Sequence, residues 1–123
     1  MRPLSFSELL DRVLTETPGA VSVTLMGFDG IAIDTRESGD PPTVSAQNTA
    51  IELGAVASQL KTVAEGLGAG EVRELTLQTG ELTTVLRPVT EEYVVALSLR
   101  PGGNTGKGRY LLRVVAPKLV AEL

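Results

Sequence analysis

The chain has no cysteine and no histidine among its 123 residues. It can therefore form neither disulfides nor thiolate metal sites, and it lacks the usual general base and the commonest zinc ligand. Tryptophan is also absent, and only four aromatic residues, Phe6, Phe28, Tyr93 and Tyr110, are available to line a pocket. This scarcity argues against a flat-ring ligand and leaves an aliphatic one open. We expect no enzyme activity, catalytic residue, metal site or cofactor.

The balance of charge and the absence of long apolar runs narrow the function further. A net charge of −4 argues against a nucleic-acid partner held through its phosphates. Residues 1–8 contain no apolar run suited to a signal peptide, and no other segment is long and apolar enough to span a bilayer. We expect a single domain, residues 1–123, that is cytoplasmic and does not insert into membranes.

The first third of the chain predicts a helix followed by a β-hairpin. Ser5 and Glu8 fit a capping box, and a one-sided apolar stripe follows until residues 17–19, Thr-Pro-Gly, end the helix. Apolar and polar residues then alternate on both sides of a turn at residues 27–30, Gly-Phe-Asp-Gly, which is typical of a hairpin. Residues 37–43, Glu-Ser-Gly-Asp-Pro-Pro-Thr, predict an exposed, mobile loop.

A long, nearly charge-free helix is predicted from about Ser45 to Leu67, and it carries two adjacent stripes. The larger apolar residues, which suit burial against a sheet, are Leu53, Val56, Leu60, Val63 and Leu67. The neighbouring stripe of mostly small residues consists of Ala50, Gly54, Ala57, Lys61 and Ala64. Small residues let another backbone come close, so this stripe indicates a symmetric helix pair. The alternative, that it fits under a loop or beside the last helix of the same chain, stays open.

Three strands are predicted after that helix, at Val72–Thr79, Leu82–Pro88 and Tyr93–Leu99, and their short connections favour an antiparallel meander. The last of the three is apolar on both faces, as a central strand would be. The first has one polar face, which indicates an edge strand that little prevents from pairing with a copy of itself. That polar face consists of Glu74, Thr76 and Gln78.

A closing helix is predicted from about Gly106 to Glu122, with a kink or a shortened last turn at Pro117. The order of elements favours an α+β fold. It would consist of a five-stranded antiparallel sheet with one long helix on one face and two terminal helices on the other.

In this order of elements the chain resembles the Roadblock/dynein-light-chain family, and in particular its bacterial stand-alone, MglB-like members. The most recognisable passages are the helix end at Pro18-Gly19-Ala20, the strand-turn-strand segment at residues 23–33, and the alanine-rich helix at residues 48–64. The resemblance covers nearly the whole chain. It implies a Roadblock-like, profilin-like α-β-α sandwich.

The resemblance also implies a homodimer, or a heterodimer with a related chain, with the long helices side by side and two sheets joined through the strand that follows. The interface would then consist of Ala50, Gly54, Ala57, Lys61, Ala64, Glu74, Thr76 and Gln78. Similar proteins hold a small Ras-like GTPase on the paired helices or at their chain ends. The outward positions here would be Asn48, Glu52, Gln59 and Thr62, for which a solvated helix face is the alternative interpretation.

The functional hypothesis is a non-enzymatic dimeric module that binds and regulates a small Ras-like GTPase. The alternative is a dimeric scaffold subunit of a larger assembly that does not sense nucleotide.

Two sets of residues resemble parts of enzymes. Residues 102–108, Gly-Gly-Asn-Thr-Gly-Lys-Gly, are spaced in part like a phosphate-binding loop, but Pro101 replaces its first glycine and Gly108 its Ser/Thr. They predict a flexible connection, and a weak anion site beside Lys107 stays open.

Acidic and basic residues near loops form the second set. We expect Glu91 and Glu92 to be solvated because adjacent residues point in different directions. Arg36 and Arg100 are the arginines best placed to reach outward as an arginine finger. The related regulators instead act on the switch regions of the GTPase.

Overall fold

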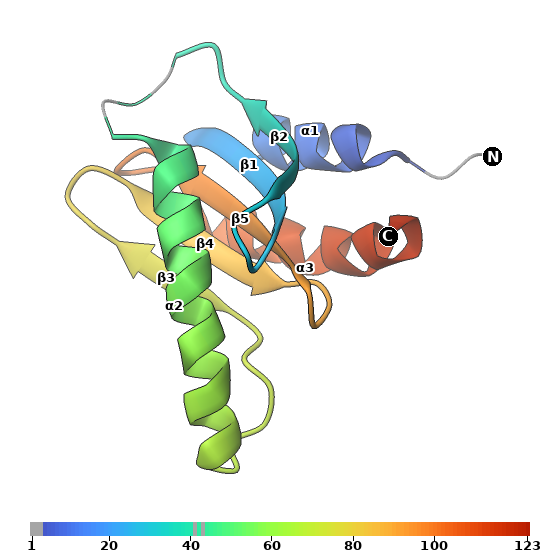
Figure 1. The fold of residues 1–123 in the computed structure, drawn as a ribbon. Helices are drawn as coiled ribbons and strands as arrows, with labels where there is room; N and C mark the ends of the chain where they lie inside the picture. Colours follow the sequence, from blue (N-terminus) through green and yellow to red (C-terminus); the bar gives the residue numbers. More distant parts are fainter. Residues whose placement is uncertain (1–3, 41, 43) are drawn as a thin grey trace.

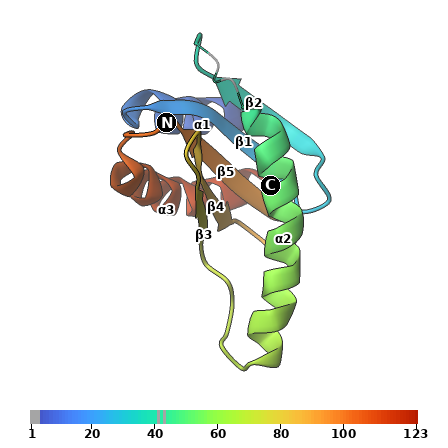
Figure 2. The ribbon, with the colours of Figure 1, turned by 90° about the vertical axis from the view of Figure 1, so that its left-hand side faces the viewer.

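One antiparallel sheet of five strands organises the structure, a computed structural model that describes residues 4–40, 42 and 44–123. The elements are α1 (Phe6–Glu16), β1 (Ala20–Gly27), β2 (Ala32–Glu37), α2 (Ala46–Gly66), β3 (Leu75–Gln78), β4 (Thr83–Pro88), β5 (Tyr93–Leu99) and α3 (Thr105–Glu122). The strands lie in the order β2-β1-β5-β4-β3. Helix α2 crosses one face, while α1 and α3 cover the other (Figures 1 and 2). The predicted α+β architecture is therefore confirmed.

Local signals fix the elements that surround the sheet. The Ser5 side chain accepts a hydrogen bond from the Glu8 backbone N–H, and the Glu8 carboxylate accepts one in return, so the predicted capping box is present. Ser45 caps α2 by accepting from the Asn48 N–H. Of the predicted loop at residues 37–43, Glu37 ends β2 instead, while Pro41 and Thr43 lie outside the described residues.

The central position of β5 explains its apolar sequence. It pairs with β1 on one side and with β4 on the other, and Val95 lies opposite both Leu25 and Arg87. Side chains of β5 alternate between two cores. The α1 and α3 side contains Leu10, Val13, Leu97, Leu112 and Val115, and the α2 side contains Met26, Leu53, Leu86, Val94 and Ala96. The expected central strand is confirmed.

The small residues of α2 face the sheet of their own chain. Ala50 and Ala57 are 2% and 1% exposed, and Gly54 is buried. A Cβ atom built on Gly54 would lie only 3.0 Å from the Met26 Cε atom. Helix α2 thus approaches the sheet so closely that a side chain at position 54 would require the end of the Met26 side chain to shift. The prediction that these three residues pair two helices of different chains is wrong.

The larger apolar stripe of α2 turns outward instead. Leu53 is buried as predicted, but Leu60 is only half-buried and Val56, Val63 and Leu67 are exposed. These residues lie on a different side of the helix from the buried Ala50 and Ala57, and Figures 1 and 2 show that the C-terminal end of α2 also extends beyond the sheet. The predicted burial of this stripe against the sheet is therefore wrong for Val56, Val63 and Leu67, and holds only in part for Leu60.

Several element boundaries differ from prediction, most of them by one residue. Strand β3 begins at Leu75 rather than Val72, after an irregular stretch from the end of α2. Helix α3 continues through Pro117 to Glu122. Of the two predicted effects of Pro117, the shortened last turn is therefore wrong, and the kink stays a prediction. Pro117 is exposed, which leaves room for the helix to continue although one backbone hydrogen bond is lost. None of the described helices has the length and apolar character that a membrane span requires.

The close approach of α2 to the sheet predicts that Ala57→Glu lowers the free energy of unfolding by about 3 kcal/mol or more, because it buries an unpaired carboxylate. Ala55→Glu, on the exposed side of the same helix, is the matched control and should change stability by about 0.5 kcal/mol or less. Urea unfolding followed by circular dichroism measures both. Equal stabilities for the two variants would contradict the assignment of Ala57 to the sheet side.

Candidate interaction surface

A strip of large apolar side chains runs along the projecting half of α2. Val56 is 44%, Val63 53% and Leu67 76% exposed. Their spacing of seven and four residues places them on one side of the helix. Large apolar groups gathered on one helix flank favour contact with another protein surface. We call Val56, Val63 and Leu67 the apolar strip.

The opposite flank of α2 is held by loops of the same chain. The Lys61 Nζ atom donates to the Glu91 carbonyl oxygen at 3.1 Å and lies 4.0 Å from the centre of the Phe28 ring. The Glu91 carboxylate adds an ion pair at 4.0 Å. Val63 follows Lys61 by two residues, about 200° around the helix. The apolar strip therefore faces away from the β1–β2 and β4–β5 loops.

Strand β3 offers a second unpartnered feature. It lies at one end of the sheet and pairs only with β4. Its Leu77 side chain is 41% exposed. A strand edge with unpaired backbone groups can pair with a strand from another chain. The predicted edge position of β3 is thus confirmed, and the pairing of this edge with a copy stays a prediction.

The predicted interface residues divide into three groups: those that are buried, those that contact other residues of the same chain, and those that are exposed. Ala50, Gly54 and Ala57 are unavailable to a partner, and Lys61 contacts its own chain. Ala64 is partly exposed, as is Glu74, whose carboxylate binds Arg109 at 2.7 and 2.8 Å. Thr76 and Gln78 are exposed on β3. The candidate surface therefore keeps the β3 edge, and the apolar strip replaces the small residues of α2.

The positions predicted to meet a partner are on the surface. Asn48, Glu52, Gln59 and Thr62 are all exposed along the outer side of α2. Their outward orientation is as predicted, and their contact with a partner stays a prediction. Together with the apolar strip they form a face with both polar and apolar groups, which is the usual composition of a non-obligate interface.

Sequence reasoning missed the apolar strip, although one signal could have revealed it. A helix of 21 residues is about 31 Å long at 1.5 Å per residue. Five strands spaced about 4.8 Å apart span only about 19 Å between the outer two. A helix of this length can extend beyond such a sheet, and its apolar residues on the projecting part then lack a covering surface.

The residues that resembled enzyme parts are occupied within the chain. Arg36 pairs with Asp11 at 3.3 Å, and Arg100 pairs with Asp40 at 3.2 Å. Each arginine is thus held in a surface ion pair within its own chain, and an outward role for either stays a prediction.

Glu91, Glu92 and the glycine loop before α3 are the other residues of these two sets. Glu91 and Glu92 are exposed, as predicted. The Asn104 side chain caps α3 by accepting from the Lys107 N–H at 3.0 Å. The described residues contain no group of three or more acidic, histidine or cysteine side chains suited to a metal ion.

Comparison with known structures identifies the family. MglC from Myxococcus xanthus is 38% identical to the chain, with a TM-score of 0.70, and the match covers 98% of this chain and 100% of MglC. The chain belongs to the Roadblock/LC7 family, as an MglB/MglC-type member. No protein-family model and no curated protein sequence matches the chain.

More distant Roadblock structures share the fold. The gliding protein MglB from Thermus thermophilus is 20% identical with a TM-score of 0.81, over 99% of this chain and 97% of that one. A Roadblock/LC7 domain from Streptomyces avermitilis is 18% identical with a TM-score of 0.73, and the match covers 97% of this chain and 99% of that domain. This Roadblock protein therefore keeps the architecture of its family along its whole length.

The apolar strip generates a prediction about self-association. Val63→Glu should weaken association of this Roadblock protein with itself at least about tenfold, because a charge would replace apolar contact area. Thr62→Glu, one residue away and off the strip, should have little effect. Sedimentation equilibrium measures association, and circular dichroism checks that both variants fold. An unchanged association constant for Val63→Glu would remove the strip from the interface.

Proposed function

We propose that this Roadblock protein is a non-enzymatic, cytoplasmic, self-associating module that binds and regulates a small Ras-like GTPase. The observations that carry the proposal are the exposed apolar strip on α2 and the unpaired edge of β3. Both features lack a partner in the described part of the chain. Such features suit the joining of protein chains.

Relatives of the chain support the proposal of a self-associating module. One structure of MglB has a tetrameric arrangement, and the MglB of Thermus thermophilus is a gliding protein. Self-association through α2 and β3 would join two sheets and place two α2 helices on one face. The exposed residues Glu52 and Gln59 on each helix would then offer a broad polar surface to the GTPase.

Regulation would follow from unequal affinity for the two nucleotide states of the GTPase. A protein that binds one switch conformation more tightly shifts the GTPase toward that conformation, and the shift is limited by the difference in binding free energy. A scaffold subunit would instead bind both states equally. Nucleotide dependence of binding therefore separates the proposed regulator from the alternative.

The first test is affinity capture from a lysate of the source cells with GDP or with a non-hydrolysable GTP analogue, read by mass spectrometry. We expect a Ras-like GTPase enriched in only one of the two samples. Capture of the same GTPase at equal levels in both would favour the scaffold function. Capture without any GTPase would overturn the proposed regulation.

Titration of the captured GTPase then tests the face of α2. Glu52→Lys should weaken binding about tenfold, because it reverses a charge at an interface position. Glu16→Lys makes the same change of charge on α1, across the sheet, and should leave the affinity within about twofold. Isothermal titration calorimetry measures both affinities. If the two variants lose affinity equally, the effect belongs to net charge rather than to the α2 face.

A further inference from the structure

Helix α3 has an outer side that combines positive charge with apolar groups. Its inner side, with Leu112, Val115 and Leu119, packs against the sheet. At 3.6 residues per turn, Tyr110 and Pro117 project from the opposite side of the helix and form a ridge, and both are exposed. The Tyr110 side chain is 53% exposed. An aromatic ring that stands this far out in water favours contact with another surface.

Cations flank this ridge on both sides. Lys107 and Lys118 lie on one flank, and Arg109 and Arg113 lie on the other. All four are exposed. Arg109 pairs with Glu74. In the part of the chain that the structure describes, no ion pair joins the other three cations to a carboxylate. The outer side of α3 is therefore positively charged along its length, although the chain has a net charge of −4.

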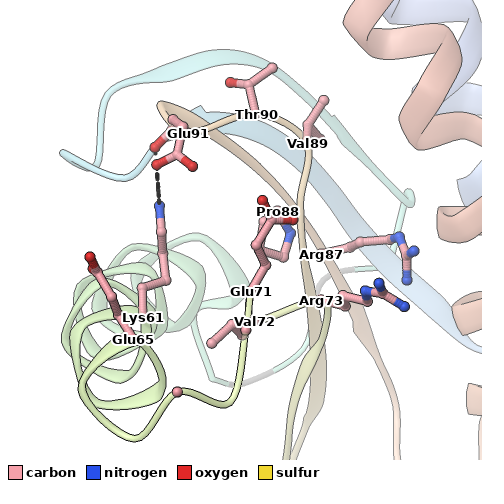
Figure 3. A pocket seen from close by; sticks show the side chains of 12 residues that line it. Lys61, Glu65, Glu71, Val72, Arg73, Arg87, Pro88, Val89, Thr90 and Glu91 are labelled. Atoms are coloured by element: carbon pink, nitrogen blue, oxygen red, sulfur yellow. Dashed lines mark hydrogen bonds and ion pairs between the residues drawn. The ribbon is translucent and has the colours of Figure 1, made fainter.

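Two arginines of the neighbouring strand region add to this charge. Arg87 lies opposite Val95, which belongs to the core under α1 and α3, so the Arg87 side chain leaves β4 on the α3 side of the sheet. Figure 3 shows the Arg73 and Arg87 side chains running away from α2. Neither forms an ion pair within the described residues. The one carboxylate beside them in the strand register, that of Glu74, binds Arg109 of α3 instead.

The acidic residues on this face of the molecule are few or already engaged. Glu122, in the last turn, is the only acidic residue of α3. Helix α1 covers the same face of the sheet (Figure 2), and its carboxylates have partners: Glu8 accepts from the Ser5 N–H, Asp11 pairs with Arg36, and Glu16 pairs with Arg12. The α3 side of the sheet therefore carries more positive than negative charge.

The shape of the outer side of α3 favours a flat partner. It is the convex outside of a helix. Residues of α3 line neither the groove of about 900 Å³ beside the end of α2 nor the cavity of about 170 Å³ beside its start. Extended segments of partner proteins are bound in grooves or along strand edges. A membrane surface is flat, attracts lysine and arginine when it contains anionic lipid, and accepts tyrosine rings at its interface.

We propose that the outer side of α3 rests on membranes rich in anionic phospholipid. Tyr110 and Pro117 would lie at the interface, and Lys107, Arg113 and Lys118 would contact the lipid phosphates. Buried apolar area and electrostatic attraction add in such binding. The contact is peripheral and needs no helix to cross the bilayer. The proposal does not rest on GTPase binding, because α2 lies on the opposite face of the sheet and would point away from the membrane (Figures 1 and 2).

Co-sedimentation with lipid vesicles tests the proposal. Vesicles of phosphatidylcholine with about one third phosphatidylglycerol should bind the wild-type protein at low salt, and vesicles of pure phosphatidylcholine should bind it at least about tenfold more weakly. Lys107→Gln/Lys118→Gln should lose about tenfold in binding to the anionic vesicles. Absence of wild-type binding, or equal binding to both kinds of vesicle, would overturn the proposal.

A matched control separates this face from the net charge of the protein. Gln47→Glu/Ala55→Glu lowers the net charge by the same amount, at exposed positions of α2 across the sheet. It should keep the binding to anionic vesicles within about threefold, because these charges lie far from the membrane and are screened. Circular dichroism checks that both double variants fold. Equal losses in the two would overturn the assignment to α3.

A single tryptophan reports on the ridge itself, because the chain contains none. The fluorescence of Tyr110→Trp should shift to shorter wavelength when anionic vesicles are added, since the ring moves out of water into the interface. Ala55→Trp, at an exposed position of α2, should keep its emission. A shift of both signals, or of neither, would contradict the proposed orientation.

Soluble poly-glutamate distinguishes a membrane from an acidic protein as the partner of this face. At the same concentration of negative charge, it should leave the protein bound to the anionic vesicles, because it offers no interface for Tyr110. Displacement of the protein by poly-glutamate would show that the face follows negative charge alone. That outcome would overturn the membrane assignment in favour of an acidic protein segment.

Discussion

The close packing of α2 on the sheet is the constraint from which the exposed surfaces follow. Ala50, Gly54 and Ala57 are small enough for the helix backbone to pack closely against Met26 and its neighbours in the sheet. Once these residues face the sheet, the rotation of the helix is fixed. The larger residues on the neighbouring stripe, such as Val63, must then point sideways and remain exposed. The apolar strip is therefore a geometric consequence of a helix whose smallest side chains form its buried face.

On the second face of the sheet, a glycine again allows a helix to pack closely. A Cβ atom on Gly108 would lie 2.6 Å from the Leu97 Cδ2 atom and 3.2 Å from the Thr17 Cγ2 atom. Glycine at this position lets the first turn of α3 rest directly on β5. The sheet is thus approached closely by a helix on each side, with Gly54 against Met26 of β1 on one face and Gly108 against Leu97 of β5 on the other. This double covering explains why β5 needs apolar residues at nearly every position.

Features that depend on nearby residues were predictable from the sequence, and features that depend on distant residues were not. The capping box at Ser5 and the outward position of Glu52 follow from local patterns, and the family resemblance added the order of layers. Both stripes of α2 are largely apolar, so periodicity could not decide which one meets the sheet; packing against Met26 decides it. The ion pair that holds Arg36 joins segments far apart in the chain, so no local pattern indicated it. The same limitation hid the unpaired state of Arg87.

The charge pattern around β3 connects the fold to its surfaces. Glu74 lies just before β3 and binds Arg109 of α3, so it ties the start of the edge strand to the helix behind the sheet. This contact fixes the chain where it returns from the projecting end of α2. One carboxylate therefore links the residue before the edge strand to α3 and is not available to Arg87, which lies opposite it in the strand register.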